Sequence, residues 1–361
     1  MNPVKAWIKL VSVKGIGNAK AIKIARKLGP PQNYIGKSSD LLDEIDFLTD
    51  NEKKKLDDKT FPEDWQRIEK LMGKYGIKFV SILDEKYPQP LKNIYDPPPF
   101  LFYRGTIKEK DYRRAIAVVG TRKASNYGKL SCKKIVRKLA EAGFTIISDL
   151  AYGIDTVAHF AALETGGRTL SVFATGCDQI YPPRNRKLAE RISENGALLS
   201  EFIPGKKAEK WNFPTRNRII SGLSLGTLVI EGSKKSGALL TSKFALEQNR
   251  DIFALPGDIN RKQAQGPNYL IKLGANIVTK AEDILDFYNL QLQSAEKPKP
   301  EMTDNEKKLY NIIFNHKPEV HFDKLLLISD FSISELSSLL LSLELKSMIK
   351  KVSGSRYMAM Y

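Results

Sequence analysis

The sequence is poor in the residues that form cross-links and metal sites. Its 361 residues include two cysteines, Cys132 and Cys177, and three histidines, which are scattered at His159, His316 and His321. The cysteines are not in a C-x-x-C arrangement. This inventory excludes a disulfide framework and cannot assemble a zinc cluster. We therefore expect neither a bound metal nor a cofactor.

Long apolar runs are also missing. No apolar stretch reaches the length that spans a bilayer, and the opening residues MNPVKAWIKL lack the apolar core of a signal peptide. We therefore expect a soluble, cytoplasmic protein without a membrane partner.

Acidic residues are in deficit. The chain has 41 Asp and Glu against 58 Lys and Arg, which gives a formal net charge of +17. A phosphate-rich partner explains this excess better than a merely basic surface does, because binding a polyanion releases its counterions. The charge thus favours a nucleic-acid partner.

The N-terminal part predicts a small helical domain over residues 1–76. The stretch from residue 7 to residue 30 predicts two helices around a Lys14–Gly17 turn, and it resembles a helix-hairpin-helix or SAM-like unit. Such a turn presents backbone N–H groups to a phosphate. An ordinary helical turn with lysines on its solvent side explains the same residues equally well.

Residues 77–289 predict an α/β core with a proline-rich beginning. From residue 115 onward, short β-branched runs such as AIAVV and GTLVIEG alternate with amphipathic stretches of helix length. This alternation predicts an extended Rossmann-like core, in which a parallel, doubly wound sheet is covered on both faces. Ligands of such sheets bind at the carboxyl ends of the strands.

The C-terminal part predicts a linker over residues 290–302 and a winged helix over 303–361. The third helix of this unit begins at a capping box, Ser332 to Glu335. Its outward positions are poorly basic, which favours a protein-contacting or scaffold role over base readout. A reader of double-stranded DNA remains the alternative.

The loop VVGTRKASNYG, residues 118–128, follows the first strand of the core. It has neither the G-x-G-x-x-G fingerprint nor a Walker Lys-Ser/Thr pair. Gly120 lets backbone approach an anion, Thr121 and Ser125 offer hydroxyls, and Arg122 offers a forked cation. The loop therefore suits a phosphate without an adenosine-specific contact, although a plain turn with an exposed arginine is the simpler reading.

Three further stretches add candidates for the same cleft. His159, among Ala and Phe, is expected to be a packed core histidine, whereas Arg168 precedes a strand and could point into the cleft. Arg216 and Arg218 bracket Asn217 near the start of a helix. Finally, Ser236 and Gly237 lead into a helix that carries Thr241, which forms a second candidate anion cradle.

These motifs resemble the DprA/Smf family of bacterial DNA-processing proteins. The similarity rests on V-G-T-R-x-x-S-x-Y-G (118–128), S-x-L-A-x-G-I-D-x-x-A-H (148–159), T-G-x-D-x-x-Y-P (175–182), S-E-x-x-P-G (200–205), F-P-x-R-N-R-I-I-S-G (213–222), E-x-x-x-x-S-G-A-L-x-T (231–241) and G-x-N-x-L-I-x-x-G-A (266–275). It implies a non-enzymatic core that binds and protects single-stranded DNA and loads the RecA recombinase in natural transformation.

The resemblance also implies roles for individual residues. It places Arg122, Arg168 and the Arg216–Arg218 segment in the DNA pocket, and it implies a homodimer whose contacts involve Asn268, Tyr269, Leu270 and Ile271. The chain departs from the usual family pattern at Asp149, where the family has glycine, and at Tyr152, where it often has arginine. An acid here would repel DNA unless it turns away, whereas a tyrosine could stack on a base.

An enzyme on the same core is the alternative function. Nucleotide phosphoribohydrolases of the Lonely Guy type share a Rossmann-like sheet with phosphate-binding loops. They carry a P-G-G-x-G-T signature followed by an acidic catalyst, and the signature is absent from this sequence. Glu201 and Glu231 stand at strand ends without that context.

Overall fold

The computed structural model describes residues 1–37, 40–58, 60–61, 64–290, 302–316, 319–346, 348–352 and 354–359. The chain divides into two compact units, Met1–Gln293 and Ser294–Tyr361, which are described separately. Most of the linker predicted at 290–302 lies outside the described residues.

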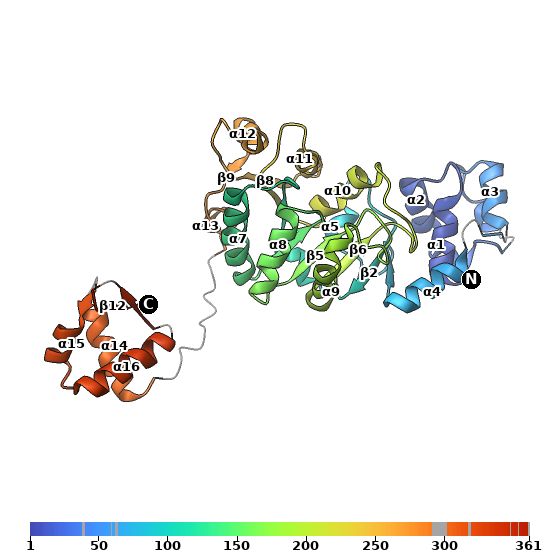
Figure 1. The fold of residues 1–361 in the computed structure, drawn as a ribbon. Coiled ribbons are helices and arrows are strands. Elements are labelled where there is room, and N and C mark those ends of the chain that lie inside the picture. Colours follow the sequence, from blue (N-terminus) through green and yellow to red (C-terminus); the bar gives the residue numbers. More distant parts are fainter. Residues whose placement is uncertain are drawn as a thin grey trace. The chain divides into compact units, whose positions relative to one another are not determined.

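A nine-stranded sheet organises the first unit (Figure 1). Its order is β1-β2-β6-β5-β4-β3-β7-β8-β9. Strands β1 and β2 are antiparallel to their neighbours, and the pairs from β6 through β9 are parallel. The bounds are β1 Lys78–Ser81, β2 Phe100–Gly105, β3 Ala115–Val119, β4 Thr145–Ser148, β5 Thr169–Val172, β6 Ala197–Ser200, β7 Gly226–Val229, β8 Asp251–Ala254 and β9 Asn276–Ile277. The predicted α/β class with a mostly parallel sheet is confirmed.

Helices cover both faces of this sheet because successive residues of each strand point to opposite sides. In β3, Ile116 and Val118 pack with the helices that follow β3 and β4, whereas Ala117 and Val119 belong to the core on the other face. The helices of the core are α5 Gln89–Lys92, α6 Lys110–Arg113, α7 Asn126–Glu141, α8 Ile154–Glu164, α9 Arg186–Asn195, α10 Asn212–Gly222, α11 Gly237–Glu247, α12 Gln265–Lys272 and α13 Glu282–Phe287. The strand order reverses between β3 and β7, which is where ligands of doubly wound sheets bind.

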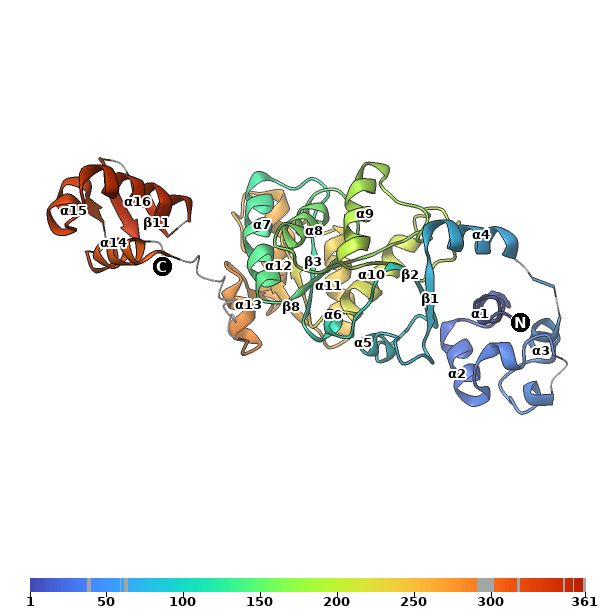
Figure 2. The ribbon, with the colours of Figure 1, turned by 90° about the horizontal axis from the view of Figure 1, so that it is seen from below.

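The N-terminal helices pack beside the antiparallel edge of the sheet (Figures 1 and 2). They are α1 Pro3–Ser12, α2 Asn18–Leu28, α3 Asp50–Asp57 and α4 Trp65–Tyr75. Trp7 of α1 is buried and contacts Phe100 of β2 edge to face, with ring centroids 6.3 Å apart. Because these helices share one hydrophobic core with the sheet, the domain boundary after residue 76 remains a prediction.

The second unit has its own hydrophobic core of helices and a small sheet. Its elements are α14 Asp304–Asn315, β10 Val320–His321, α15 Phe322–Ile328, α16 Ile333–Leu345, β11 Ile349–Val352 and β12 Arg356–Ala359. The antiparallel strands are arranged as β10-β12-β11. Ser332 and Glu335 form the capping box expected at the start of α16.

Among the described residues, no single helix is long and apolar enough to span a membrane. Helices α15 and α16 meet the length and composition criteria only as a pair, and they are bent by 116°. Both contribute leucines to the core of the second unit.

Candidate nucleic-acid interface

A cleft opens at the carboxyl ends of the parallel strands, at the point where the strand order reverses. Gly120, Thr121 and Arg122 after β3, and Asp149 after β4, form one wall. Residues of α10 and of the start of α11 complete it, and the space measures about 940 Å³ including its open mouth. Eight of the predicted site residues line this cleft: Gly120, Thr121, Arg122, Arg216, Asn217, Ser236, Gly237 and Thr241.

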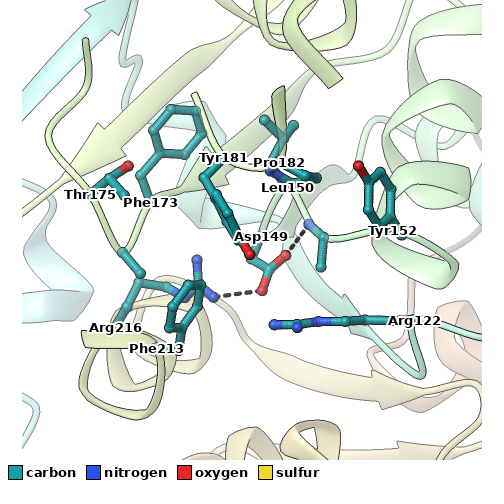
Figure 3. A pocket seen from close by; sticks show the side chains of 12 residues that line it. Arg122, Asp149, Leu150, Tyr152, Phe173, Thr175, Tyr181, Pro182, Phe213 and Arg216 are labelled. Atoms are coloured by element: carbon teal, nitrogen blue, oxygen red, sulfur yellow. Dashed lines mark hydrogen bonds and ion pairs between the residues drawn. The ribbon is translucent and has the colours of Figure 1, made fainter. Parts of the chain in front are cut away.

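A smaller hollow of about 470 Å³ continues from the cleft and is lined with aromatic rings. Figure 3 shows Arg122 reaching across this hollow toward Phe213 and Asp149. The guanidinium carbon of Arg122 lies 5.8 Å from the centre of the Phe213 ring, and Tyr181 packs edge to face on the same ring. Tyr152 and Tyr181 are 40% and 49% exposed, which leaves ring surface open to a flat ligand.

Arg122 differs from the other predicted arginines because no described residue accepts a hydrogen bond from it. The loop that carries it packs closely against α8, since a Cβ on Gly120 would overlap Ile154. A guanidinium that is exposed and unpaired at the mouth of a cleft can bind an anion without first breaking an ion pair.

Arg216 is held by the protein itself. Its Nη2 atom lies 2.5 Å from Oδ2 of Asp149, Nη1 donates to the carbonyl of Val172, and Nε donates to the side chain of Asn217. The arginine is 3% exposed, so it shapes the cleft floor rather than offering free donors.

Asp149 shares this floor with a second carboxyl group, that of Asp155. Burial opposes the charge on Asp149, but Arg216 and hydrogen bonds, including one from the backbone of Ala151, hold its pKa below the ordinary value. Burial, followed by the charge of Asp149, raises the pKa of Asp155 well above its ordinary value. Of the two carboxyl groups, Asp149 therefore holds its negative charge more readily, and it lies against the Arg216 guanidinium.

His159 lies beneath this pair and is fully buried, as expected for a core histidine. Its ring nitrogens contact the Thr169 hydroxyl and the Asp149 carbonyl, both at 2.6 Å. Burial lowers the pKa of His159 to about 4, so this side chain is neutral at physiological pH.

The N-terminus of α11 faces the cleft without a side-chain cap. The Ser236 hydroxyl is buried and makes no hydrogen bond within the described residues, and Gly237 has no Cβ that would restrict access. An uncapped helix start has unsatisfied N–H groups and a partial positive charge, both of which favour an anion.

Three predicted site residues do not line this cleft, so the expectation that they share it is corrected here. Arg168 precedes β5, at the opposite end of the sheet, where Asp111 and the Thr106 carbonyl hold its guanidinium. Arg218 is buried between Asp96 and Glu201.

Ser125 is the third of these residues, and its contacts are structural. Its hydroxyl donates to Oε1 of Glu231 and accepts from the backbone of Gly128, so it caps α7 instead of facing the cleft. The loop sequence showed the right residue types, but the partners that engage them come from distant parts of the chain.

Of the aromatic lining, Tyr152 was predicted from the sequence as a stacking residue, whereas Phe213 and Tyr181 were not. Phe213 and Tyr181 lie inside the quoted F-P-x-R-N-R and T-G-x-D-x-x-Y-P stretches, and that position was the available signal. Tyr127, the tyrosine of the 118–128 loop, does not line the hollow; its hydroxyl donates to the Pro256 carbonyl at 2.7 Å and its ring lies under Arg261.

The residues expected at a dimer contact lie on α12, away from the cleft. Leu270 is buried in the core, and Asn268 makes two hydrogen bonds with Gly257. Tyr269 is 42% exposed and Ile271 is half-buried. Tyr269 is therefore the member of this group that offers the most surface.

The fold and the site together define a class: doubly wound α/β proteins whose cleft at the strand-order reversal combines an unpaired arginine, an uncapped helix start and aromatic rings. A family model described as DNA recombination-mediator protein A matches residues 78–289. The chain belongs to this family.

Known relatives agree with this assignment. The chain is 44% identical to DNA processing protein DprA of Bacillus subtilis over 211 residues, which are 58% of this chain and 71% of the relative. It is 38% identical to protein Smf of Synechocystis over 283 residues, 77% of this chain and 71% of the relative.

Solved structures show the same fold. The X-ray structure of DNA processing protein A from Streptococcus pneumoniae superposes with a TM-score of 0.67 at 35% identity, covering 79% of this chain and 97% of that one. A structure of DNA processing protein A from Helicobacter pylori, described as giving insight into its single-stranded DNA binding mode, superposes with a TM-score of 0.53 at 28% identity. The match covers 59% of this chain and 96% of that one.

Proposed function

We propose that this protein is a DNA-processing protein that binds single-stranded DNA in the cleft between β3 and β7. Arg122 and the start of α11 bind backbone phosphates, and bases stack on Phe213 and the neighbouring tyrosines. The observation that carries the proposal is the unpaired Arg122 beside an exposed aromatic hollow. The H. pylori relative, described as binding single-stranded DNA, supports the same ligand.

The cleft chemistry explains why a single strand is the preferred ligand. Stacking on aromatic rings needs bases that are free of a duplex, and it contributes about 1–3 kcal/mol per base with little sequence preference. A phosphate contact adds affinity that falls with salt, because binding releases counterions. The chain's net charge of +17 supports such a salt-dependent interaction.

The finer assignments belong to the same proposal. We propose that the protein protects the strand and loads RecA onto it during transformation or recombination, as a homodimer in contact through the α12 segment Asn268–Ile271. We further propose a helical domain over residues 1–76 and a winged helix over residues 303–361. The resemblance of the motifs supports these assignments.

The phosphoribohydrolase alternative gains no support from the carboxylates. Glu231 accepts hydrogen bonds from Ser125 and Arg261, so its oxygens are already engaged. Glu201 is paired with Arg218, and burial raises the pKa of Glu201. Neither group lines the cleft.

The proposal is tested by fluorescence anisotropy with a labelled poly-dT strand and a matched duplex across a salt series. Arg122→Ala should weaken strand binding about tenfold or more and should lower the salt slope by about 0.7, the value for one phosphate contact with a single strand. Lys123→Ala is the matched control, since it removes the same charge one residue away, and it should have a small effect. Equal binding by both variants and the wild type would contradict the proposed cleft.

A further inference from the structure

Glu231, two residues after the end of β7, supports the loop that carries Arg122. The residue is 2% exposed. Its backbone carbonyl accepts from the N–H of Thr121 at 2.7 Å. Its carboxylate accepts from the N–H and the hydroxyl of Ser125 at 2.9 and 2.6 Å. Arg122 therefore lies on a short loop whose two sides are both fixed to this one glutamate.

The close approach of this carboxylate requires a glycine at position 128. A Cβ on Gly128 would overlap Oε2 of Glu231. Gly128 also donates its N–H to the Ser125 hydroxyl at 3.1 Å, and this bond caps α7. The start of α7 is thus built around the Glu231 side chain.

Arg261 contacts the same carboxylate from another part of the chain. Its Nη2 atom lies 2.6 Å from Oε1 of Glu231 and also donates to the Ser125 hydroxyl. Its guanidinium lies over the ring of Tyr127, at 5.0 Å from the centroid. The segment that precedes α12 is therefore joined to the Arg122 loop through one ion pair.

The neighbouring backbone continues this connection to α12. The N–H of Gly232 donates to the Gln263 carbonyl at 2.6 Å, and the N–H of Gly266 donates to the Gly232 carbonyl at 2.8 Å. Tyr269 on α12 and Leu273, directly after it, are 42% and 65% exposed. Two adjacent residues, Glu231 and Gly232, thus contact both the cleft loop and the start of α12.

We propose that Glu231 and Arg261 are a positioning pair that holds the Arg122 loop in its strand-binding conformation and couples that loop to α12. This inference rests on the proposed binding of single-stranded DNA. Neither residue touches the strand; both act through Ser125 and the backbone of the loop. A loop that is ordered before binding loses less entropy when it binds, so the pair increases affinity without adding a contact.

The coupling operates in both directions. If ordering the loop also orders the segment before α12, then strand binding and any contact made by α12 change each other's affinity by the same factor. Couplings of this kind amount to roughly 5–150-fold. The α12 face is where we propose that a second copy docks, so the pair would link dimer formation to strand binding.

The first test compares Arg261→Met with Lys262→Met. Both variants remove one positive charge, but Lys262 is exposed and forms no ion pair with a described residue. We expect Arg261→Met to weaken poly-dT binding about tenfold with an unchanged salt slope, and Lys262→Met to bind within about twofold of the wild type. Arg261→Lys, which keeps the charge on Glu231, should recover part of the loss and serves as the second variant if the methionine variant fails to fold.

The second test is hydrogen exchange of the full chain with and without the poly-dT strand. In the wild type, strand binding should slow exchange at residues 120–128 and also at residues 258–273. In Arg261→Met, protection of residues 120–128 should persist at a saturating strand concentration, whereas protection of residues 258–273 should disappear. A residue that merely stabilised the fold would not change this strand-dependent pattern.

The outcomes separate this inference from the proposed function. If Arg122→Ala weakens binding while Arg261→Met behaves like Lys262→Met, the positioning role is wrong and the proposed cleft stands. If residues 258–273 show no strand-dependent protection in the wild type, the coupling is wrong. If Arg122→Ala itself binds normally, the proposed function fails and the inference fails with it.

Discussion

Asp149 places a carboxylate on the floor of a cleft that we propose binds phosphate. Its negative charge is compensated by Arg216, whose Nη2 lies 2.5 Å away, and it also lowers the positive potential around Arg122. An acid here does not turn away from the cleft; it serves as an internal partner for a buried arginine. The carboxylate at position 149 therefore contributes directly to the electrostatics of the cleft that it lines.

Asp149→Asn should strengthen strand binding. The amide oxygen can still accept a hydrogen bond from Arg216, and the positive charge of that arginine is then no longer offset by the carboxylate. Unit charges about 4 Å apart interact by about 1 kcal/mol in water, so we expect a gain of about fivefold. Anisotropy with poly-dT at low salt measures the effect. Glu164→Gln, which removes an acid on the outer side of α8, is the control, and an equal gain there would attribute the change to net charge alone.

The sequence alone could not show which of the candidate arginines is free to bind a phosphate, because their acidic partners were unknown. Arg122, Arg168, Arg216 and Arg218 all follow motifs that suit a phosphate, yet the last three are bound to Asp111, Asp149 and Glu201. Each acidic partner is at least 17 residues away in the chain. The residue types of the site were therefore predictable, but which charges remain free depends on tertiary contacts.

At the scale of elements, the strands were the most predictable part. Runs such as AIAVV and GTLVIEG are buried on both faces, and only a parallel sheet between helix layers provides that environment. For the helical turn at Lys14–Gly17, the sequence did not distinguish a phosphate-binding turn from an ordinary one. A Cβ on Gly15 would overlap the Glu52 carboxylate, which pairs with Lys20 at 2.7 Å, so an internal acid lies against this turn.

The second unit uses a similar acid at the start of α14. Glu306 completes a capping box with Thr303, and its oxygens also contact Lys346 at 2.7 and 2.8 Å. The hydrogen bond from Lys346 is the largest of the effects that lower the pKa of Glu306 to about 2. A carboxyl whose pKa is lowered by folding stabilises the native state above its unfolded pKa, and this contribution is lost as pH falls through the folded pKa.

Glu306→Gln should therefore lower the melting temperature of the second unit at pH 7, and the difference from the wild type should vanish as pH falls from about 4.5 toward about 2. Scanning calorimetry of the full chain at several pH values measures this. Glu335→Gln is the control, because Glu335 forms the same capping box on α16 and pairs with no lysine in the part of the chain that the structure describes. At pH 7, Glu335→Gln should lower the melting temperature less than Glu306→Gln does. Equal decreases would mean that Lys346 contributes little.

At the scale of the whole molecule, the positive charge is unevenly distributed between the two units. The chain has a net charge of +17, but residues 291–361 contain ten Lys and Arg against nine Asp and Glu. The outward surface of α16 includes Ser334, Ser337, Leu341 and Leu345, none of which binds phosphate by charge. The excess charge that favours a polyanion therefore belongs to the first unit.

Removing residues 291–361 should leave strand binding within about twofold of the full chain and the salt slope nearly unchanged. The slope reports phosphate contacts, and the removed residues have an excess of only one positive charge. The hydrophobic cores of the two units are separate, so the shortened chain retains its own core. Anisotropy with both poly-dT and a matched duplex measures the outcome. A loss of duplex binding alone would identify the second unit as a reader of double-stranded DNA. If both affinities persist, we infer that the exposed α16 surface of the second unit contacts a protein rather than DNA.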